Sequence, residues 1–150
     1  MTDRSTIVPA LSYADPNAAV SFLEAAFGFE SGLSVTDSGG RIQHAELTYG
    51  DGRIMLGPMG WADWAKSPKM VSGVNTQSVH VAVTDIDAHC AKARAAGAEI
   101  LAEPADQFYG DRTYRARDPE GHVWSFGQRM REVSAAEMEA TTGLKVKEKP

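Results

Sequence analysis

The sequence contains one cysteine, no long hydrophobic run and no excess of basic residues. The single cysteine, Cys90, excludes a disulfide within the chain and is interpreted as a small buried hydrophobic residue. No apolar stretch reaches the length of a signal-peptide core or a membrane span, so we expect a cytoplasmic protein with no membrane partner. The net charge of −5 argues against a nucleic-acid partner, which requires a concentrated basic patch, and would suit a cationic ligand.

What the chain does contain is ordinary globular composition arranged as an internal repeat. Hydrophobic residues make up 43% of its 150 residues, which is enough to bury a core. Residues 108–127 predict a β-hairpin, because a polar strand is followed by the turn DPEG and then by an aromatic strand. A fainter copy precedes it: residues 51–55 align with 120–124, and residues 43–47 align with 112–116. The sequence therefore predicts two copies of one unit.

Each copy has the same predicted order of elements. In the first, Asp15 caps a helix that ends at Gly28, and strands are expected at residues 6–13, 30–36, 41–49 and 53–56. In the second, Asp85 caps a helix that ends at Gly97, and strands are expected at 78–84, 99–104, 111–117 and 122–126. The expected fold class is α+β, with two βαβββ units that pair into an incomplete barrel around a concave cavity.

The division of the chain follows from the same pattern. We assign residues 1–60 to the first unit, 61–76 to a connecting segment, 77–130 to the second unit, and 131–150 to a C-terminal helix and tail, all within one compact domain. The terminal helix is expected because Ser134 and Glu137 have the spacing of a capping box.

The paired units, the Asp-led helices and the motif DPEGHVW at residues 118–124 resemble the vicinal oxygen chelate superfamily. This superfamily includes glyoxalase I, extradiol dioxygenases, fosfomycin resistance enzymes and bleomycin resistance proteins. The resemblance covers about residues 5–128. It implies a ligand cavity on the concave side and a homodimer, and in the enzymes a metal held by the first and fourth strands of each unit.

The positions that correspond to those metal ligands lack suitable donors. The resemblance places them at Val8, Leu56, Ser78 and Ser125. A divalent metal prefers imidazole, carboxylate or thiolate ligands, which none of these side chains provides. We therefore predict no metal site and no cofactor. The alternative that retains a metal is a substitute site built from His44, Glu46 and His80.

Strand parity indicates four polar residues for the cavity. His44 and Glu46 share one face of their strand, and the repeat places Arg115 at the position of Glu46. His80 lies two residues after Ser78 and so on the same face. His80 and Arg115 are the candidate catalytic pair, a general base and an oxyanion partner. The opposing interpretations are a solvated strand face for His44 and Glu46, a hydrogen-bonded interior residue for His80, and a simple ion pair for Arg115.

Aromatic residues and the remaining histidines complete the set. Trp61 and Trp64, in the connection, and Tyr109, before the last hairpin, are candidate ligand contacts at the rim of the cavity; packing of the loop or of a dimer interface is the alternative for the tryptophans. We interpret His122 as structural and His89 as a surface residue.

Two functions remain open from the sequence. The first is a protein that binds a small molecule in its cavity without a metal, similar to the bleomycin resistance branch. The second is a lyase, isomerase or dioxygenase of the glyoxalase type with relocated site residues. Whether the protein is an enzyme is left undecided.

Overall fold

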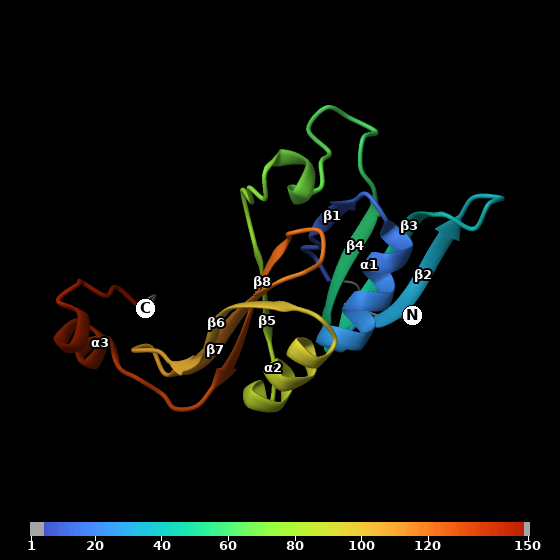
Figure 1. Ribbon diagram of the computed structural model, residues 1–150. Coiled ribbons are helices and arrows are strands. Elements are labelled where there is room, and N and C mark those ends of the chain that lie inside the picture. Colours follow the sequence, from blue (N-terminus) through green and yellow to red (C-terminus); the bar gives the residue numbers. More distant parts are fainter. Residues whose placement is uncertain (1–4, 149–150) are drawn as a thin grey trace.

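The computed structural model describes residues 5–148, which form two modules and a C-terminal helix (Figure 1). The first module consists of β1 (Ala10–Tyr13), α1 (Pro16–Phe22), η1 (Leu23–Phe27), β2 (Glu30–Thr36), β3 (Ile42–Tyr49) and β4 (Gly52–Pro58). The second consists of β5 (Val79–Ala82), α2 (Ile86–Ala95), β6 (Glu99–Asp106), β7 (Asp111–Arg117) and β8 (Val123–Arg129). Between them lies η2 (Pro68–Val71), and after them α3 (Ala135–Thr142).

Each module folds its strands into one four-stranded mixed sheet. The strand order is β1-β4-β3-β2 in the first sheet and β5-β8-β7-β6 in the second. In both sheets the first strand runs parallel to the fourth, and the other pairs are antiparallel. The two sheets do not close into a barrel. The predicted α+β class and the βαβββ repeat are confirmed.

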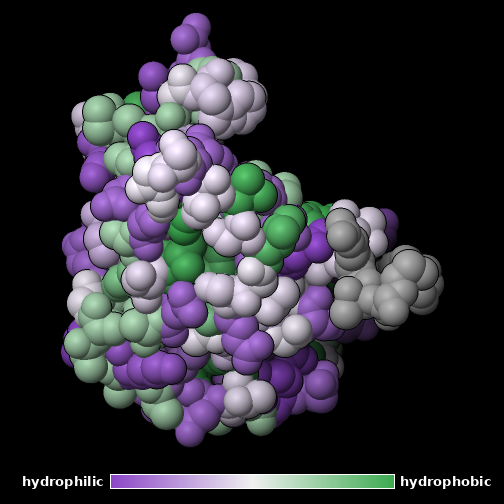
Figure 2. Space-filling model, turned by 90° about the vertical axis from the view of Figure 1, so that its right-hand side faces the viewer, coloured by the Kyte–Doolittle hydropathy of each residue, from purple (hydrophilic) through white to green (hydrophobic). Residues whose placement is uncertain are grey.

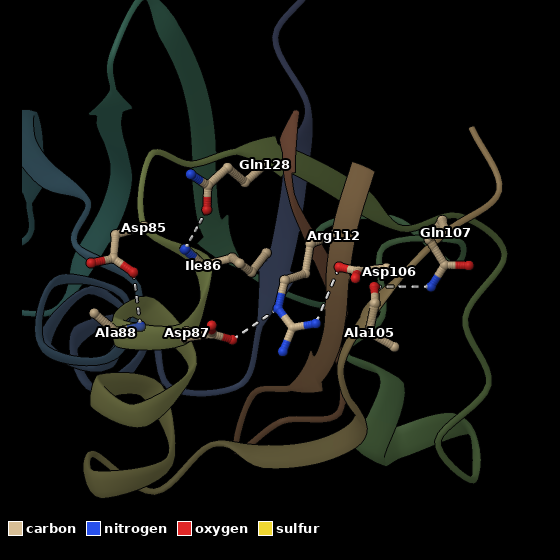
Figure 3. Close-up of polar contacts among 9 residues, drawn as sticks. All are labelled: Asp85, Ile86, Asp87, Ala88, Ala105, Asp106, Gln107, Arg112 and Gln128. Atoms are coloured by element: carbon tan, nitrogen blue, oxygen red, sulfur yellow. Dashed lines mark hydrogen bonds and ion pairs between the residues drawn. The ribbon is translucent and has the colours of Figure 1, made fainter. Parts of the chain in front are cut away.

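Local capping signals set the start of each module's helix. The Asp15 carboxylate accepts a hydrogen bond from the amide of Ala18 at 3.0 Å, and Asp85 accepts one from Ala88 at 3.3 Å. Figure 3 shows the second cap beside another anchor, in which the side-chain oxygen of Gln128 accepts a hydrogen bond from the amide of Ile86 at 3.0 Å. Helix α2 is thereby fixed to β8, the strand that carries much of the site described below.

The first helix changes pitch before it ends. Segment η1 is π-helical, and Gly28 follows it with a φ of 82°, a left-handed conformation that a side chain would disfavour. This ending directs the chain back into β2. The predicted stop at Gly28 is therefore correct, and the π-helical turn is a feature that helical periodicity alone does not predict.

The core lies where the helical sides of the two modules meet. Phe27 of η1 is fully buried, and its ring centroid lies 5.5 Å from that of Trp124 and 4.8 Å from that of Phe126 in the other module. Strand residues alternate accordingly: Ala45 and Leu47 face this core. The opposite face of each sheet is left open.

Strands β1 and β6 have bounds that differ from those predicted from the sequence. Strand β1 begins at Ala10, so Pro9 precedes it, and β6 continues to Asp106 through Pro104. Pro104 is tolerated because β6 is an edge strand whose pairing with β7 is interrupted between Ala102 and Ala105.

Two regions are not covered by the rest of the chain. Helix α3 extends away from both sheets in Figure 1, and none of its residues is buried. Figure 2 shows hydrophobic surface among hydrophilic side chains on the side of the molecule where β2 lies. Leu33 and Val35 of β2 are 58% and 48% exposed. No helix within residues 5–148 is long and apolar enough to cross a membrane.

Candidate functional site

The DPEGHVW motif forms a junction between the two modules. Asp118 is buried, and its Oδ1 accepts hydrogen bonds from the amides of Glu120 and His122, which close the turn. Its Oδ2 accepts one from the hydroxyl of Tyr13 at 2.7 Å and one from the indole of Trp124 at 3.2 Å. Burial, followed by the charge of Asp118, raises the pKa of Tyr13 well above its usual value, so this hydroxyl keeps its proton and donates.

Glu120 extends the junction to the start of α1 and to the connection. Its carboxylate accepts hydrogen bonds from the amides of Ala14 at 2.7 Å and Asp15 at 2.9 Å, and from the hydroxyl of Ser67 at 2.6 Å. The Nε2 of His122 lies 2.9 Å from the carbonyl oxygen of Ser12. These contacts agree with a structural role for His122, and they assign the acids of the motif to holding the modules together.

His89 was predicted to lie on the surface, but the structure shows that it is partly buried. Its Nε2 donates to the carbonyl of Phe27 at 2.8 Å, and its Nδ1 lies 2.6 Å from the hydroxyl of Tyr114. Burial lowers the pKa of His89, outweighing the Phe27 bond, and Lys92 lowers it further. The prediction failed because the neighbour Lys92 suggested a solvated face, whereas η1 of the other module covers this position.

The open face of the second sheet holds a hydrogen-bonded pair, His80 and Ser125. His80 Nδ1 and Ser125 Oγ lie 2.7 Å apart, on directly paired positions of β5 and β8. The imidazole ring lies against Gly127, where an added Cβ would come within 3.0 Å of the ring. Gly127 therefore makes room for the ring of His80. Sequence reasoning counted Ser125 only as a missing metal ligand and so missed its role beside His80.

A cavity of about 310 Å³ opens beside this pair. Its walls come from β5, β6, β7 and β8 and from the turn that carries Tyr109. Polar side chains predominate around it: His80, Glu103, Gln107, Tyr109, Thr113, Tyr114, Arg115 and Ser125. Three of the candidate residues, His80, Tyr109 and Arg115, thus share one cavity. The alternative interpretation of His80 as an interior residue is wrong, because the His80 side chain is exposed and lines this cavity.

The other candidate pair lies on the open face of the first sheet. His44 Nε2 is 3.1 Å from Glu46 Oε2, and Glu46 Oε1 is 3.1 Å from Arg53 Nη1. Neither His44 nor Glu46 lines the cavity beside His80. The four polar candidates therefore fall into two groups, one on each sheet.

The tryptophans lie apart from both groups. Trp61 and Trp64 are 68% and 75% exposed and pack edge to face, with ring centroids 4.7 Å apart. Trp64 lines a different cavity, of about 550 Å³, between the connection and strands β1 and β5. Lys66 and His122 also line it. Of these aromatic candidates, Tyr109 therefore lines the cavity beside His80, whereas Trp64 lines the larger cavity.

The metal positions implied by the resemblance require one correction. Leu56 is buried on the helix side of β4, so it cannot face a cavity. The true equivalent of Ser125 is Met55, which pairs with Ala10 as Ser125 pairs with His80. The alignment of residues 51–55 with 120–124 was therefore wrong by one residue, because the turn between β7 and β8 is longer than the turn between β3 and β4.

The corrected positions still do not fit the metal centre of the enzymes. They carry Val8, Met55, Ser78 and Ser125, and none of these offers imidazole, carboxylate or thiolate. Within residues 5–148 there is also no group of three or more His, Cys, Asp or Glu side chains placed to hold a metal ion. We therefore derive no chemistry through a metal.

Comparison with known proteins agrees with this architecture. An uncharacterized protein of Mycobacterium bovis is 33% identical over 135 residues, covering 88% of each chain. The crystal structure of TioX from Micromonospora sp. ML1 shares 36% identity with a TM-score of 0.68, covering 83% of this chain and 98% of that one. TnmS3, an antibiotic binding protein from Streptomyces sp. CB03234, shares 19% identity with a TM-score of 0.63, covering 86% and 98%.

The family comparison agrees with the motif at the junction. Residues 7–126, which include both sheets up to β8, match the family described as the Glyoxalase/Bleomycin resistance protein/Dioxygenase superfamily. This span also contains His80, Arg115 and Ser125. The chain belongs to the Glyoxalase/Bleomycin resistance protein/Dioxygenase superfamily.

Proposed function

We propose that this protein binds a small organic molecule in the cavity beside His80, without a metal or other cofactor. The observation that carries the proposal is the His80–Ser125 hydrogen bond of 2.7 Å at a metal position of the enzymes. There, a hydroxyl replaces the carboxylate that a metal would need, and it orients an imidazole toward a polar cavity instead. Arg115 and Tyr109 supply further contacts for a ligand.

A structural neighbour supports binding as the class of function. TnmS3, which shares the fold, is described as an antibiotic binding protein. At 19% identity that likeness concerns the fold, so the nature of the ligand must come from this chain's own cavity. A cytoplasmic location is part of the proposal and rests on the sequence.

The proposal includes a homodimer. Val35 lies opposite His44 on the open face of the first sheet and is 48% exposed, and Phe108 beside the second sheet is 42% exposed. A second copy covering such side chains would bury apolar area and deepen the cavity. Sedimentation velocity measures the oligomeric state, and a single chain at micromolar concentration would contradict this part.

A catalytic alternative is favoured by one observation, the orientation of His80. Because Ser125 engages Nδ1, Nε2 is left to exchange a proton with a ligand, with Arg115 in the same cavity to stabilise an oxyanion. This would suit a metal-independent lyase or isomerase. Turnover of the hemithioacetal of methylglyoxal and glutathione, lost in His80→Ala, would favour it over simple binding.

Blocking the cavity tests the binding site directly. The probe is N-phenyl-1-naphthylamine, an uncharged aromatic molecule whose fluorescence rises in apolar surroundings. Ser125→Tyr places a large ring in the cavity, and we expect it to weaken probe binding about tenfold or more. Met55→Tyr is the matched control, because it introduces the same side chain at the equivalent position of the other sheet. Equal weakening by both variants, or no binding to the wild type, would contradict the proposed site.

A further inference from the structure

The cavity beside His80 has an unbalanced positive charge. Two side chains with fixed charge line it, Glu103 and Arg115. Glu103 is already paired: both of its carboxylate oxygens accept hydrogen bonds from Nη2 of Arg94 on α2. The backbone of Arg115 is paired within the sheet, but its guanidinium makes no hydrogen bond or ion pair with any residue in the part of the chain that the structure describes. The local charge is therefore opposite in sign to that of the whole chain.

Other arginines show that an available carboxylate is normally taken in this protein. Figure 3 shows Arg112 of β7 bridging Asp87 at 3.1 Å and Asp106 at 3.2 Å. Further arginines also pair with carboxylates: Arg53, Arg94, Arg117, Arg129 and Arg131. Arg41 donates to a main-chain carbonyl. Among the arginines of residues 5–148, Arg115 alone has a guanidinium whose N–H donors are all available to a ligand.

The neighbours of Arg115 suit an anion. A guanidinium binds carboxylate, phosphate or sulfonate through paired, charge-assisted hydrogen bonds. Ser125 is directly paired with Arg115 across β7 and β8, and it holds Nδ1 of His80. When the Ser125 hydroxyl donates to Nδ1, Nε2 carries the proton and is a second donor for the same anion. Gln107 and Thr113 bond to each other at 3.0 Å and bring no charge to the cavity.

We infer that the ligand of this cavity carries an anionic group, a carboxylate, phosphate or sulfonate, which Arg115 binds with His80 beside it. The inference rests on the proposed function and narrows it to a class of ligand. It also replaces the cationic ligand that the net charge of −5 would suit, because the charges that line a cavity decide which ligand it accepts.

Two probes that differ in one charged group test the inference. 8-Anilinonaphthalene-1-sulfonate carries a sulfonate that N-phenyl-1-naphthylamine lacks, and the two are otherwise alike. We expect the wild type to bind the sulfonate probe about tenfold more tightly than the uncharged one, and Arg115→Gln to bring the ratio of the two affinities close to one. Arg115→Lys, which keeps the positive charge, should restore part of the preference for the sulfonate probe. Arg131→Gln, which removes an exposed arginine outside the cavity, is the matched control and should keep the preference.

The outcomes separate this inference from the proposed function. If neither probe binds the wild type, the proposed function fails. If both bind equally and Arg115→Gln changes neither, the cavity binds ligands but the anionic class is wrong. If Arg115→Gln instead changes the oligomeric state in sedimentation velocity and leaves the preference intact, Arg115 pairs with a second copy and the inference is overturned.

Discussion

At the scale of single residues, a side-chain contact could be predicted from the sequence when its partner lies nearby in the chain, but not when the partner is distant. Strand parity grouped His44 with Glu46, which are two residues apart and 3.1 Å from each other. It could not predict the contacts of Glu120, whose partners Ala14 and Ser67 are 106 and 53 residues away. Such contacts depend on how the modules pack, which no local pattern encodes.

Glu120 gives the first prediction at this scale. Glu120→Gln removes the charge and replaces one acceptor oxygen with a donor, so part of its set of three hydrogen bonds is lost in a buried site. We expect the free energy of unfolding to fall by about 1–3 kcal/mol. Urea unfolding followed by circular dichroism measures this.

The matched control is Glu139→Gln, on the exposed α3. It should leave the free energy of unfolding within about 0.5 kcal/mol of the wild type. Equal stability of the two variants would show that the Glu120 contacts do not hold the modules together.

At the scale of elements, the sequence predicted the helices better than the contacts between them. Asp15 and Asp85 cap their helices through amides three residues away, so the signal is local and was read correctly. The position of His89 depends on Phe27, 62 residues away, and on Tyr114, 25 residues away. Sequence periodicity shows which face of α2 is apolar but not which element covers its border.

His89 gives a prediction about pH. Burial lowers its pKa in the folded protein below the unfolded value. Below the unfolded pKa, near about 6.5, the unfolded chain therefore binds more protons than the folded one, and stability falls as the pH falls toward the lowered value. Above that range the contribution of neutral His89 is fully present.

The measurement compares the wild type with His89→Gln in urea at about pH 7.5 and about pH 5.5, on either side of the unfolded pKa. Gln cannot be protonated, so the stability advantage of the wild type should be largest at the higher pH and shrink at the lower one. Comparing the two proteins cancels the other histidines. An advantage that stays constant or grows on acidification would contradict the neutral state of His89.

At the scale of the whole molecule, the repeat has diverged into two unlike halves. Equivalent positions on the open faces carry Glu46 and Arg115, and Met55 and Ser125. The first sheet neutralises its glutamate with Arg53, whereas the second leaves its arginine available beside a cavity. The fold could be predicted because the repeat is visible in the sequence. The separation of the polar candidates into two groups could not, because it depends on how the two sheets are placed.

The most direct test of the central claim combines metal content with ligand binding. The protein is purified without chelators and analysed for metals, and binding of 8-anilinonaphthalene-1-sulfonate is then measured before and after treatment with EDTA. The account predicts far less than one metal ion per chain and an affinity that EDTA does not change. A near-stoichiometric metal that is lost in His80→Ala or Glu46→Gln, together with loss of binding on chelation, would contradict it.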